Sequence, residues 1–338
     1  MKKSLILLFL LLIPLATAQS ENYNDRTSLT IDYNSNGEII LVGSSGFNSL
    51  TTTLYLNPME SSRQTIETLS TNPNSINNGE DLIFEWNSFQ NPFTYQLSSK
   101  IKTQNNLYPI KHIQFPIQNL DQKYEKYLEA GEIIDITPKI ITKASEIVDG
   151  ETDLYSAVFK ISDWVNNNIE YDLSTLTAEA ALQSSWVLDN REGVCDEISS
   201  LFISLSRAVG IPARFISGSA YSNLNHSFEN HGWAEIYFPG QGWIPYDITF
   251  GQFGWIDPSH IELDKSIDAG EPSVRYSWKS MGTSLESSSF QDEKLIIGEG
   301  NKIQPPFTFT IEPLFDKVGP GSYVPIKVAV QNPFEGYI

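Results

Sequence analysis

The hydrophobic period of this chain changes twice, and these changes limit the folds that it can form. Across residues 28–117, short apolar runs alternate with turn signals, as in β-structure. Across residues 120–209 the apolar positions recur at helical spacing, and across residues 213–250 the period returns to about two. Helices followed by antiparallel strands predict an α+β domain, preceded here by a region of strands alone.

The region of strands, residues 19–117, is predicted to be an N-terminal β-sandwich domain. Asn36-Gly37 lies between two β-rich runs, which is a strong hairpin signal, so we expect a turn there. The same segment resembles the first half of a calcium loop, but Gly43 occupies the twelfth position, where a bidentate Glu is required. The hairpin is therefore favoured over an ion site. Further strands are expected at residues 82–86 and 95–101, with a loop over residues 71–79.

The later elements follow from the same periods. Helices are expected at residues 124–130, 138–148, 152–168 and 195–209, and strands over residues 213–250 with breaks at 223–230 and 239–242. Residues 298–338 alternate again and are predicted to be a C-terminal β-rich segment, which could be an incomplete sandwich domain. Its strands either pair with the N-terminal sheet or belong to a domain that continues in a longer natural chain.

The N-terminus has the three parts of a secretory signal peptide. Met1-Lys2-Lys3 is followed by an apolar stretch over residues 5–15 and by Ala16-Thr17-Ala18. The apolar stretch is shorter than the roughly 20 residues that a membrane span needs. We therefore expect residues 1–18 to be cleaved, and the protein to be secreted or on the cell surface without a stable membrane span.

Charge argues against one class of partner. The chain has 41 acidic and 22 basic side chains, for a formal charge of −19, and no basic cluster lies beyond its first residues. Binding to a phosphate backbone requires clustered Lys and Arg, so we expect no nucleic-acid partner. The sequence gives no indication of the oligomeric state.

The only cysteine, Cys195, stands at the start of an amphipathic helix. It cannot form an intrachain disulfide, and no His and carboxylate spacing predicts zinc, so we expect no metal and no cofactor. The free N–H groups and the dipole at a helix N-terminus favour a thiolate. Asp196 and Glu197 oppose it, so a reactive thiol here needs a cationic partner.

His231 is the candidate for that partner, and the register of a hairpin decides whether a carboxylate can orient it. If Tyr237 pairs with Trp243, then Trp233 lies opposite Asp247, and His231 becomes a diagonal neighbour of Asp247 on the same face of the sheet. A register shifted by one residue would separate them. The interaction is therefore conditional on this pairing.

Several segments resemble the transglutaminase-like superfamily, which has a papain-like cysteine fold. They are Arg191-Glu192-Gly193-Val194-Cys195-Asp196-Glu197, Ala208-Val209-Gly210-Ile211-Pro212-Ala213-Arg214-Phe215-Ile216-Ser217-Gly218, His231-Gly232-Trp233-Ala234-Glu235 and Trp243-Ile244-Pro245-Tyr246-Asp247-Ile248-Thr249. Residues 255–261 are also similar to a segment of secreted prokaryotic members. The resemblance implies a catalytic domain at residues 118–297, with helices packed on an antiparallel sheet. Gly232 stands where the family often has Ala.

The resemblance also implies roles for three residues. Cys195 would be the nucleophile, His231 the general base and acid, and Asp247 the carboxylate that orients the ring. An acyl group of a protein or peptide would pass through a thioester to water, which is hydrolysis, or to an amine, which is cross-linking. The Cys195 N–H would be one oxyanion donor, whereas Gln183 and Trp186, the upstream candidates for a second, are expected to lie in packing or at the surface.

Two alternatives stay open from the sequence. The domain could be catalytically silent, in a cell-surface binding or adhesion protein that uses its β-sandwich domains. The protein could also have a purely structural role in a cell-surface layer, which would leave the three residues without a chemical purpose. The other histidines are expected to have lesser roles: His260 as a structural residue hydrogen-bonded near the site, His226 in a surface loop, and His112 without a partner.

Overall fold

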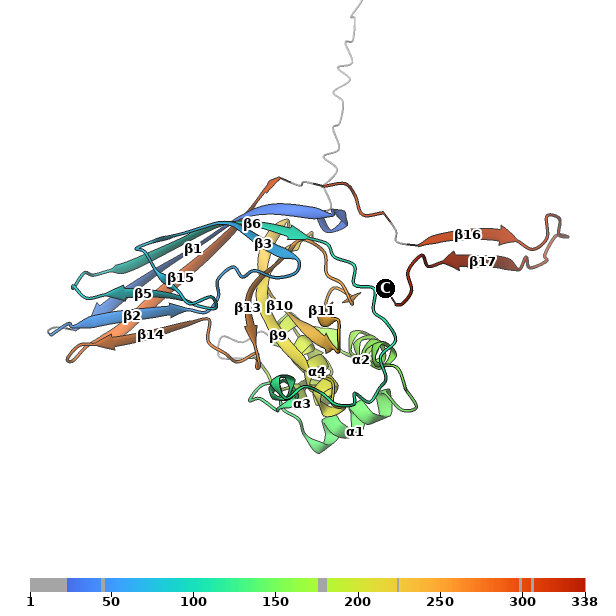
Figure 1. The fold of residues 1–338 in the computed structure, drawn as a ribbon, viewed down its shortest axis with the longest axis horizontal. Helices are drawn as coiled ribbons and strands as arrows, with labels where there is room; N and C mark the ends of the chain where they lie inside the picture. The colour runs from blue at the N-terminus through green and yellow to red at the C-terminus, as the bar shows by residue number, and fades with distance from the viewer. Residues whose placement is uncertain are drawn as a thin grey trace, which may run out of the picture.

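A computed structural model describes residues 23–43, 46–175, 181–223, 225–297, 300–304 and 307–337. Its helices pack on an antiparallel sheet between flanking strand regions, which confirms the predicted α+β class (Figure 1). The predicted signal peptide, residues 1–18, lies outside the described residues. Within the described part of the chain, no helix has the length and apolar character needed to cross a membrane.

Two four-stranded sheets lie at the N-terminal side and share one hydrophobic core; we call them the two-sheet region. Leu29, Ile31, Phe84 and Leu97 are among the fully buried side chains of that core. One sheet has the order β15-β1-β6-β3 and consists of β1 (Ser28–Val42), β3 (Gln64–Asn72), β6 (Phe93–Gln104) and β15 (Ser284–Ile297). The other has the order β14-β2-β5-β4 and consists of β2 (Ser49–Leu54), β4 (Ile76–Asn77), β5 (Leu82–Trp86) and β14 (Val274–Lys279).

The predicted turn at Asn36-Gly37 is wrong, because both residues lie inside the continuous strand β1. Gly37 pairs with Tyr95 on one side and with Ser289 on the other, so neighbouring strands hold it extended. A Cβ on Gly37 would lie 2.0 Å from Cε1 of Tyr95. The glycine is therefore required by the aromatic ring that covers it, and tertiary packing overrides the local turn signal.

Strand pairing also differs from the expected boundary at residue 297. β14 and β15 fall within residues 118–297, yet they pair with β2 and β1 of the two-sheet region. The sequence of β15 is mostly polar and carries little strand signal. It is held instead by a backbone ladder along most of β1, from Thr30 to Val42, which covers an edge that would otherwise be open.

Four helices and a five-stranded sheet form what we call the core domain. The helices are α1 (Pro138–Ile147), α2 (Leu154–Asn168), α3 (Ser184–Asn190) and α4 (Cys195–Ala208). The sheet has the order β12-β11-β10-β9-β13 and consists of β9 (Ala213–Ser222), β10 (Ser227–Phe238), β11 (Gly242–Asp247), β12 (Gln252–Phe253) and β13 (His260–Ser266). Short elements complete it: η1 (Tyr23–Asp25), η2 (Gln122–Leu128), η3 (Leu173–Thr175), β7 (Glu170–Tyr171) and β8 (Glu192–Gly193). The helix expected at residues 124–130 is the 3-10 helix η2.

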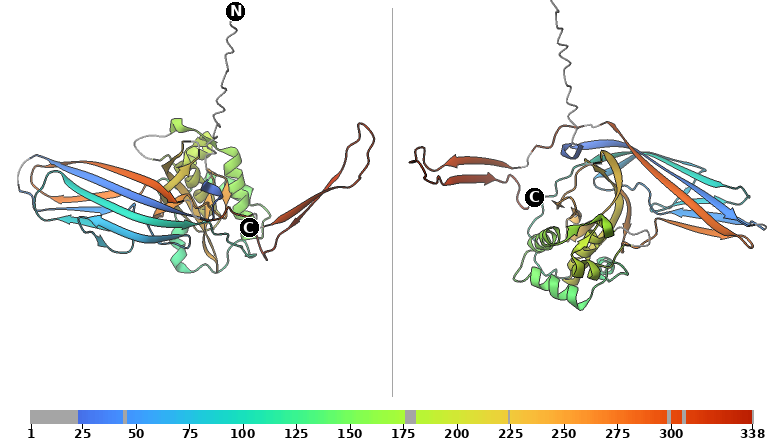
Figure 2. Two further views of the ribbon diagram at one scale, coloured as in Figure 1. Left: turned by 90° about the horizontal axis from the view of Figure 1, so that it is seen from above. Right: turned by 180° about the vertical axis from the view of Figure 1, so that it is seen from behind.

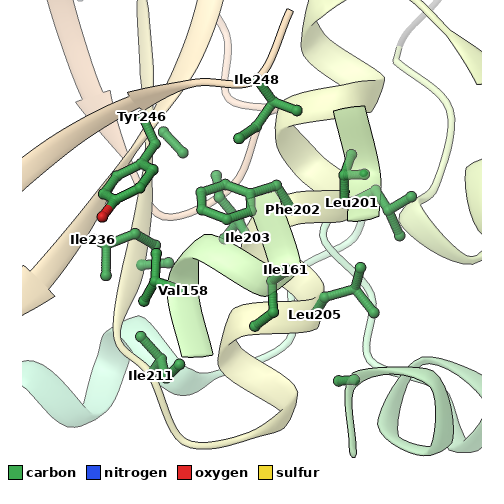
Figure 3. Close-up of a cluster of buried hydrophobic side chains, with 14 of the residues drawn as sticks. Val158, Ile161, Leu201, Phe202, Ile203, Leu205, Ile211, Ile236, Tyr246 and Ile248 are labelled. Atoms are coloured by element: carbon green, nitrogen blue, oxygen red, sulfur yellow. The ribbon is translucent and has the colours of Figure 1, made fainter. Parts of the chain in front are cut away.

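The buried side of α4 packs against β9 and β10, and α1, α2 and α3 contact its other sides. Figure 3 shows this core, in which Phe202 of α4 meets Tyr246 of β11 and Val158 of α2 lies close by. The packing fixes the N-terminus of α4 against the middle of the sheet. The residue at that N-terminus is Cys195.

Strand β13 joins the core domain to the two-sheet region. It pairs with β9 in the five-stranded sheet, while Ile261 and Leu263 pack into the core of the two-sheet region. The two regions thus share a strand, and neither is complete without it.

The C-terminal strands β16 (Thr308–Pro313) and β17 (Ile326–Gln331) pair with each other in a two-stranded sheet. Every residue of both strands is exposed. The two strands project from the side of the molecule opposite the two-sheet region, as Figure 2 shows. After β17 the chain returns to the core domain, where Tyr337 pairs with Ile110 and stacks on Tyr155.

Candidate active site

Local structure places Cys195 at the first position of α4. The side chain of Glu197 accepts hydrogen bonds from the Val194 N–H at 3.0 Å and from the Leu182 N–H at 3.1 Å, which ties down the start of the helix. Gly193 is needed here, since a Cβ would lie 2.7 Å from Cβ of Glu197. The thiol of Cys195 is half-buried and lies 3.6 Å from Oδ1 of Asp196.

The predicted register of the hairpin is confirmed. Tyr237 pairs with Trp243, so His231 and Asp247 lie on one face of the sheet. Nε2 of His231 is 2.8 Å from Oδ2 of Asp247, and both residues are buried. This contact leaves Nδ1 of the ring free of Asp247, and Cys195 and His231 lie close enough to shift the pKa of each other. The ring stacks on Phe250, whose N–H donates to Oδ1 of Asp247 at 3.0 Å.

Electrostatics couple the three groups. Burial alone lowers the pKa of His231, but the charge and hydrogen bond of Asp247 raise it to about 10. Burial alone raises the pKa of Asp247, but the charge of His231 lowers it well below its usual range. Burial also raises the pKa of the Cys195 thiol; the hydrogen bond with His231 opposes this, and the charge of Asp196 adds to it. The expected opposing effect of Asp196 is confirmed: burial and the charge of Asp196 favour the neutral thiol, and the His231 ring opposes them.

Asp247 has a second histidine partner. Nε2 of His260 lies 3.0 Å from Oδ2 of Asp247, so His260 is hydrogen-bonded beside the site, as expected. On the other side of this ring lies Asp257, which the sequence analysis did not single out. The sequence did contain a signal for this contact. Asp257 lies three residues before His260, and Asp257-Pro258 favours a turn, which brings the carboxylate close to the histidine ring.

One group of described side chains has donor atoms close enough together to bind a metal ion. Among the described residues, His231, Asp247 and His260 offer donor atoms within 4.8 Å of one another, and all three are buried. The same atoms hydrogen-bond to each other, so the group is satisfied by its own protons.

A pocket of about 350 Å³ opens over the thiol. Its lining residues are Tyr171, Leu173, Cys195, Ala220, Ser222, Asn225, Glu229, Asn230, His231, Thr249 and Phe250. Tyr171, Leu173 and Phe250 expose apolar surface at this site. The pocket is large enough for one side chain of a substrate, and its walls carry one carboxylate, Glu229.

The remaining candidates lie elsewhere. The Gln183 amide donates to the Glu132 carbonyl at 3.1 Å, and Trp186 packs on the helical core, as expected. His226 lies in the loop before β10. The expectation that His112 has no partner is wrong, since it lies 3.5 Å from Oδ2 of Asp153, at a largely exposed position.

The fold belongs to the class of papain-like, transglutaminase-like folds. Residues 141–248 match the core model of the transglutaminase-like superfamily. The matched residues include Cys195, His231 and Asp247. The transglutaminase-like fold is in general suited to thiol-dependent acyl transfer or hydrolysis.

Individual relatives agree on the fold. A solved structure of a candidate cysteine protease from Cytophaga hutchinsonii is 19% identical, covers 79% of this chain and 98% of its own, and has a TM-score of 0.54. The protein YebA of Bacillus subtilis is 23% identical over 164 residues, which are 43% of this chain and 21% of YebA. A protein-glutamine gamma-glutamyltransferase of Pseudomonas aeruginosa is 34% identical over 85 residues, which are 23% of this chain and 12% of that protein. The chain thus spans only a minor part of these curated relatives.

Proposed function

We propose that this protein is a thiol enzyme that transfers acyl groups of proteins or peptides, with Cys195 as nucleophile, His231 as general acid and base, and Asp247 as the orienting carboxylate. The observation that carries the proposal is the position of the His231 ring, which is hydrogen-bonded to buried Asp247 at 2.8 Å and lines the same pocket as a thiol at a helix N-terminus. A pocket gives a substrate access to that thiol.

In the proposed reaction, the Cys195 thiolate attacks the carbonyl carbon of a carboxamide or peptide bond. The C–N bond breaks while the His231 imidazolium gives its proton to the leaving ammonia or amine, and a thioester remains. Water or a primary amine then attacks the thioester, His231 takes the proton of the attacking group, and the thiolate leaves. Asp247 keeps the ring in one orientation through both steps.

Negative charge develops on the carbonyl oxygen during attack. The N–H of Cys195, at the first position of α4, is the donor that we assign to it. The dipole of α4 adds to this stabilisation, because its positive end lies at the helix N-terminus, where the Cys195 N–H is.

The proposal extends to location and organisation. A cationic start, an apolar stretch and Ala16-Thr17-Ala18 support export by a cleavable signal peptide, so we place the protein outside the cytoplasm, secreted or at the cell surface. We assign the chemistry to the core domain, and we assign β14 and β15 to the same domain as the N-terminal strands.

The test offers a glutamine-containing peptide with and without a primary amine, and follows the products by mass spectrometry. We expect an acyl-transfer product or a hydrolysis product with the native chain, and none with Cys195→Ser. His231→Gln should reduce the rate by roughly 10²- to 10⁴-fold, because proton transfer is lost. His112→Gln, at an exposed site away from the pocket, is the matched control and should retain the native rate.

A measurement without substrate completes the test. Cys195 is the only thiol, so iodoacetamide labels one site, and its rate near neutral pH should be much higher in the native chain than in His231→Gln. Equal rates, or product formation by Cys195→Ser, would refute the proposed chemistry and leave a binding protein.

A further inference from the structure

Both ring nitrogens of His260 face oxygen acceptors. Nε2 lies 3.0 Å from Oδ2 of Asp247, and Nδ1 lies 3.3 Å from the carbonyl oxygen of Asp257 and 3.4 Å from its Oδ1. A ring nitrogen without a proton would place its lone pair against these oxygens. The geometry therefore requires a proton on each nitrogen, which makes His260 an imidazolium.

The charged groups around the ring favour that state. Asp247 faces it from β11, Asp257 from the turn before β13, and the His231 ring lies 5.6 Å away on β10, while Trp233 and Phe250 contact it edge-on. Burial alone lowers the pKa of His260, but the charge of Asp257 and the hydrogen bond with Asp247 raise it to about 9. Burial alone raises the pKa of Asp257, but the charge of His260 lowers it, and Gln252 adds to this by donating to Oδ2 at 2.6 Å.

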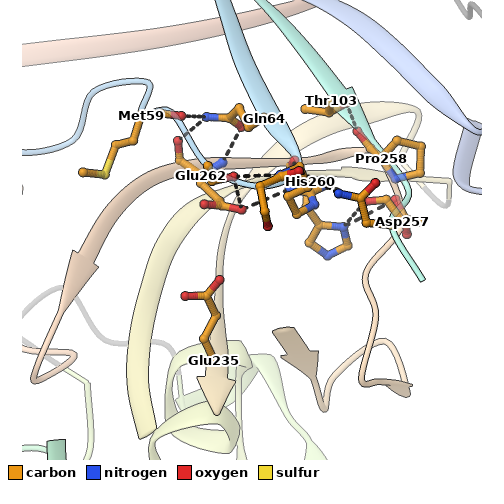
Figure 4. A network of polar contacts seen from close by, with 12 residues as sticks. Met59, Gln64, Thr103, Glu235, Asp257, Pro258, His260 and Glu262 are labelled. Carbon is orange, nitrogen blue, oxygen red and sulfur yellow. Dashed lines mark hydrogen bonds and ion pairs between the residues drawn. The ribbon is translucent and has the colours of Figure 1, made fainter. Parts of the chain in front are cut away.

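Backbone contacts from the two-sheet region fix the segment that carries His260. Arg63, which directly precedes β3, donates to the carbonyl of His260 at 2.9 Å and to that of Asp257 at 2.9 Å. The Gln64 amide donates to the Glu262 carbonyl at 2.8 Å and accepts from the Glu262 N–H at 2.9 Å. Figure 4 shows Gln64 beside Glu262, and His260 beside Asp257. The two hydrogen bonds of the Arg63 guanidinium and the two of the Gln64 amide leave the backbone of residues 257–262 little freedom.

We propose that His260 is a positioning residue for the reaction: as a buried imidazolium fixed by Asp257 and by Arg63 of the two-sheet region, it holds Asp247 and thereby orients His231 toward Cys195. This inference rests on the proposed function. It gives the two-sheet region a part in the chemistry, because Arg63 belongs to that region.

The proposal has two separable effects. One is geometric, because the Nε2–H of His260 holds Oδ2 of Asp247 where His231 needs it. The other is electrostatic, because a cation beside Asp247 offsets part of the charge that stabilises the His231 imidazolium. A neutral donor at this position would keep the first effect and remove the second.

Two substitutions separate these effects. His260→Gln keeps an N–H near the position of Nε2, so Cys195 should be alkylated within about threefold of the native rate, while the pKa of His231 should rise by about one unit. His260→Leu removes the donor, so alkylation by iodoacetamide near neutral pH should slow on the order of ten- to a hundredfold. The pKa values are measured by NMR of ¹⁵N-labelled histidine, which is practical with 4 histidines in the chain. His112→Gln is the matched control, and circular dichroism verifies that each variant is folded.

Three outcomes would overturn the positioning role. They are a neutral His260 ring in the native chain at pH 7, an unchanged pKa of His231 in His260→Gln, and native alkylation by folded His260→Leu. The proposed function fails on a different result, namely equal alkylation of Cys195 in the native chain and in His231→Gln. The two proposals can therefore fail separately.

The part of the two-sheet region is tested at Arg63. Arg63→Gln removes at least one of the two carbonyl contacts, so alkylation should slow several-fold while the pocket residues stay unchanged. Arg275→Gln, at an exposed position of β14, is the matched control and should react like the native chain. Equal rates for the two folded variants would contradict a role for the two-sheet region.

Discussion

Two strand regions flank the core domain, and they differ in how they are attached to it. The two-sheet region shares β13 with the core domain and receives Ile261 and Leu263 into its own core. The C-terminal strands β16 and β17 pair with each other and expose every residue. Hydrogen-bonded pairing is present in both regions, whereas only the first region buries apolar side chains from the core domain.

The comparison separates the contribution of hydrogen bonds between strands from the contribution of side chains buried in a shared core. Backbone hydrogen bonds replace bonds to water and contribute about 1 kcal/mol each, whereas burial of an aliphatic side chain contributes about 1.5 to 3 kcal/mol. Interior packing also transmits displacement, since it leaves little free volume. We therefore expect the two-sheet region to affect stability and chemistry, and the C-terminal strands to affect neither.

The largest effect should come from the shared strand. Leu263→Ala removes a fully buried side chain and should lower the free energy of unfolding by about 2 to 5 kcal/mol. Because β13 belongs to both regions, circular dichroism and tryptophan fluorescence should report one common transition at a lower denaturant concentration. Val330→Ala in exposed β17 is the matched control, with a change within about 0.5 kcal/mol. Separate transitions, only one of them shifted, would show that the regions fold independently.

An intermediate effect is expected where the chain returns from β17 to the core domain. The rings of Tyr337 and Tyr155 stack with centroids 4.3 Å apart and planes 4° from parallel. Tyr337→Ala should lower the free energy of unfolding by about 1 kcal/mol, the usual contribution of an aromatic pair. Tyr337→Phe keeps the ring and should behave like the native chain. A loss as large as that of Leu263→Ala would mean that this contact matches the shared strand in importance.

The smallest effect should lie within the C-terminal strands. Ile311 in β16 is 59% exposed, so Ile311→Thr should change the free energy of unfolding by less than about 0.5 kcal/mol and leave alkylation of Cys195 unchanged. Thermal unfolding and the iodoacetamide rate measure the two quantities. A loss above about 1 kcal/mol would indicate that this side chain is buried in solution, and the contrast between the two regions would then be much weaker.

Sequence reasoning succeeded where one short segment decides the result. The helical spacing after Cys195 predicted α4, and the alternation around Trp243 predicted the hairpin, with the register that pairs Tyr237 and Trp243 left as a condition that the structure then met. The register then placed His231 beside Asp247, because side chains in a strand alternate between faces. It failed at Asn36-Gly37, where a local turn signal met the ring of Tyr95 from a distant strand.

The amino-acid order by itself predicted helices α1, α2 and α4, the two strands of the central hairpin, and which residues could supply a thiol, an imidazole and a carboxylate. Only the tertiary structure decided that β14 and β15 complete the N-terminal sheets, and that Arg63 holds the backbone of His260 beside Asp247. The physical reason is the range of the interactions. Periodicity and hairpin register act between neighbours in the chain, whereas contacts such as that of Arg63 with His260 join residues far apart in the chain and exist only once both regions have folded.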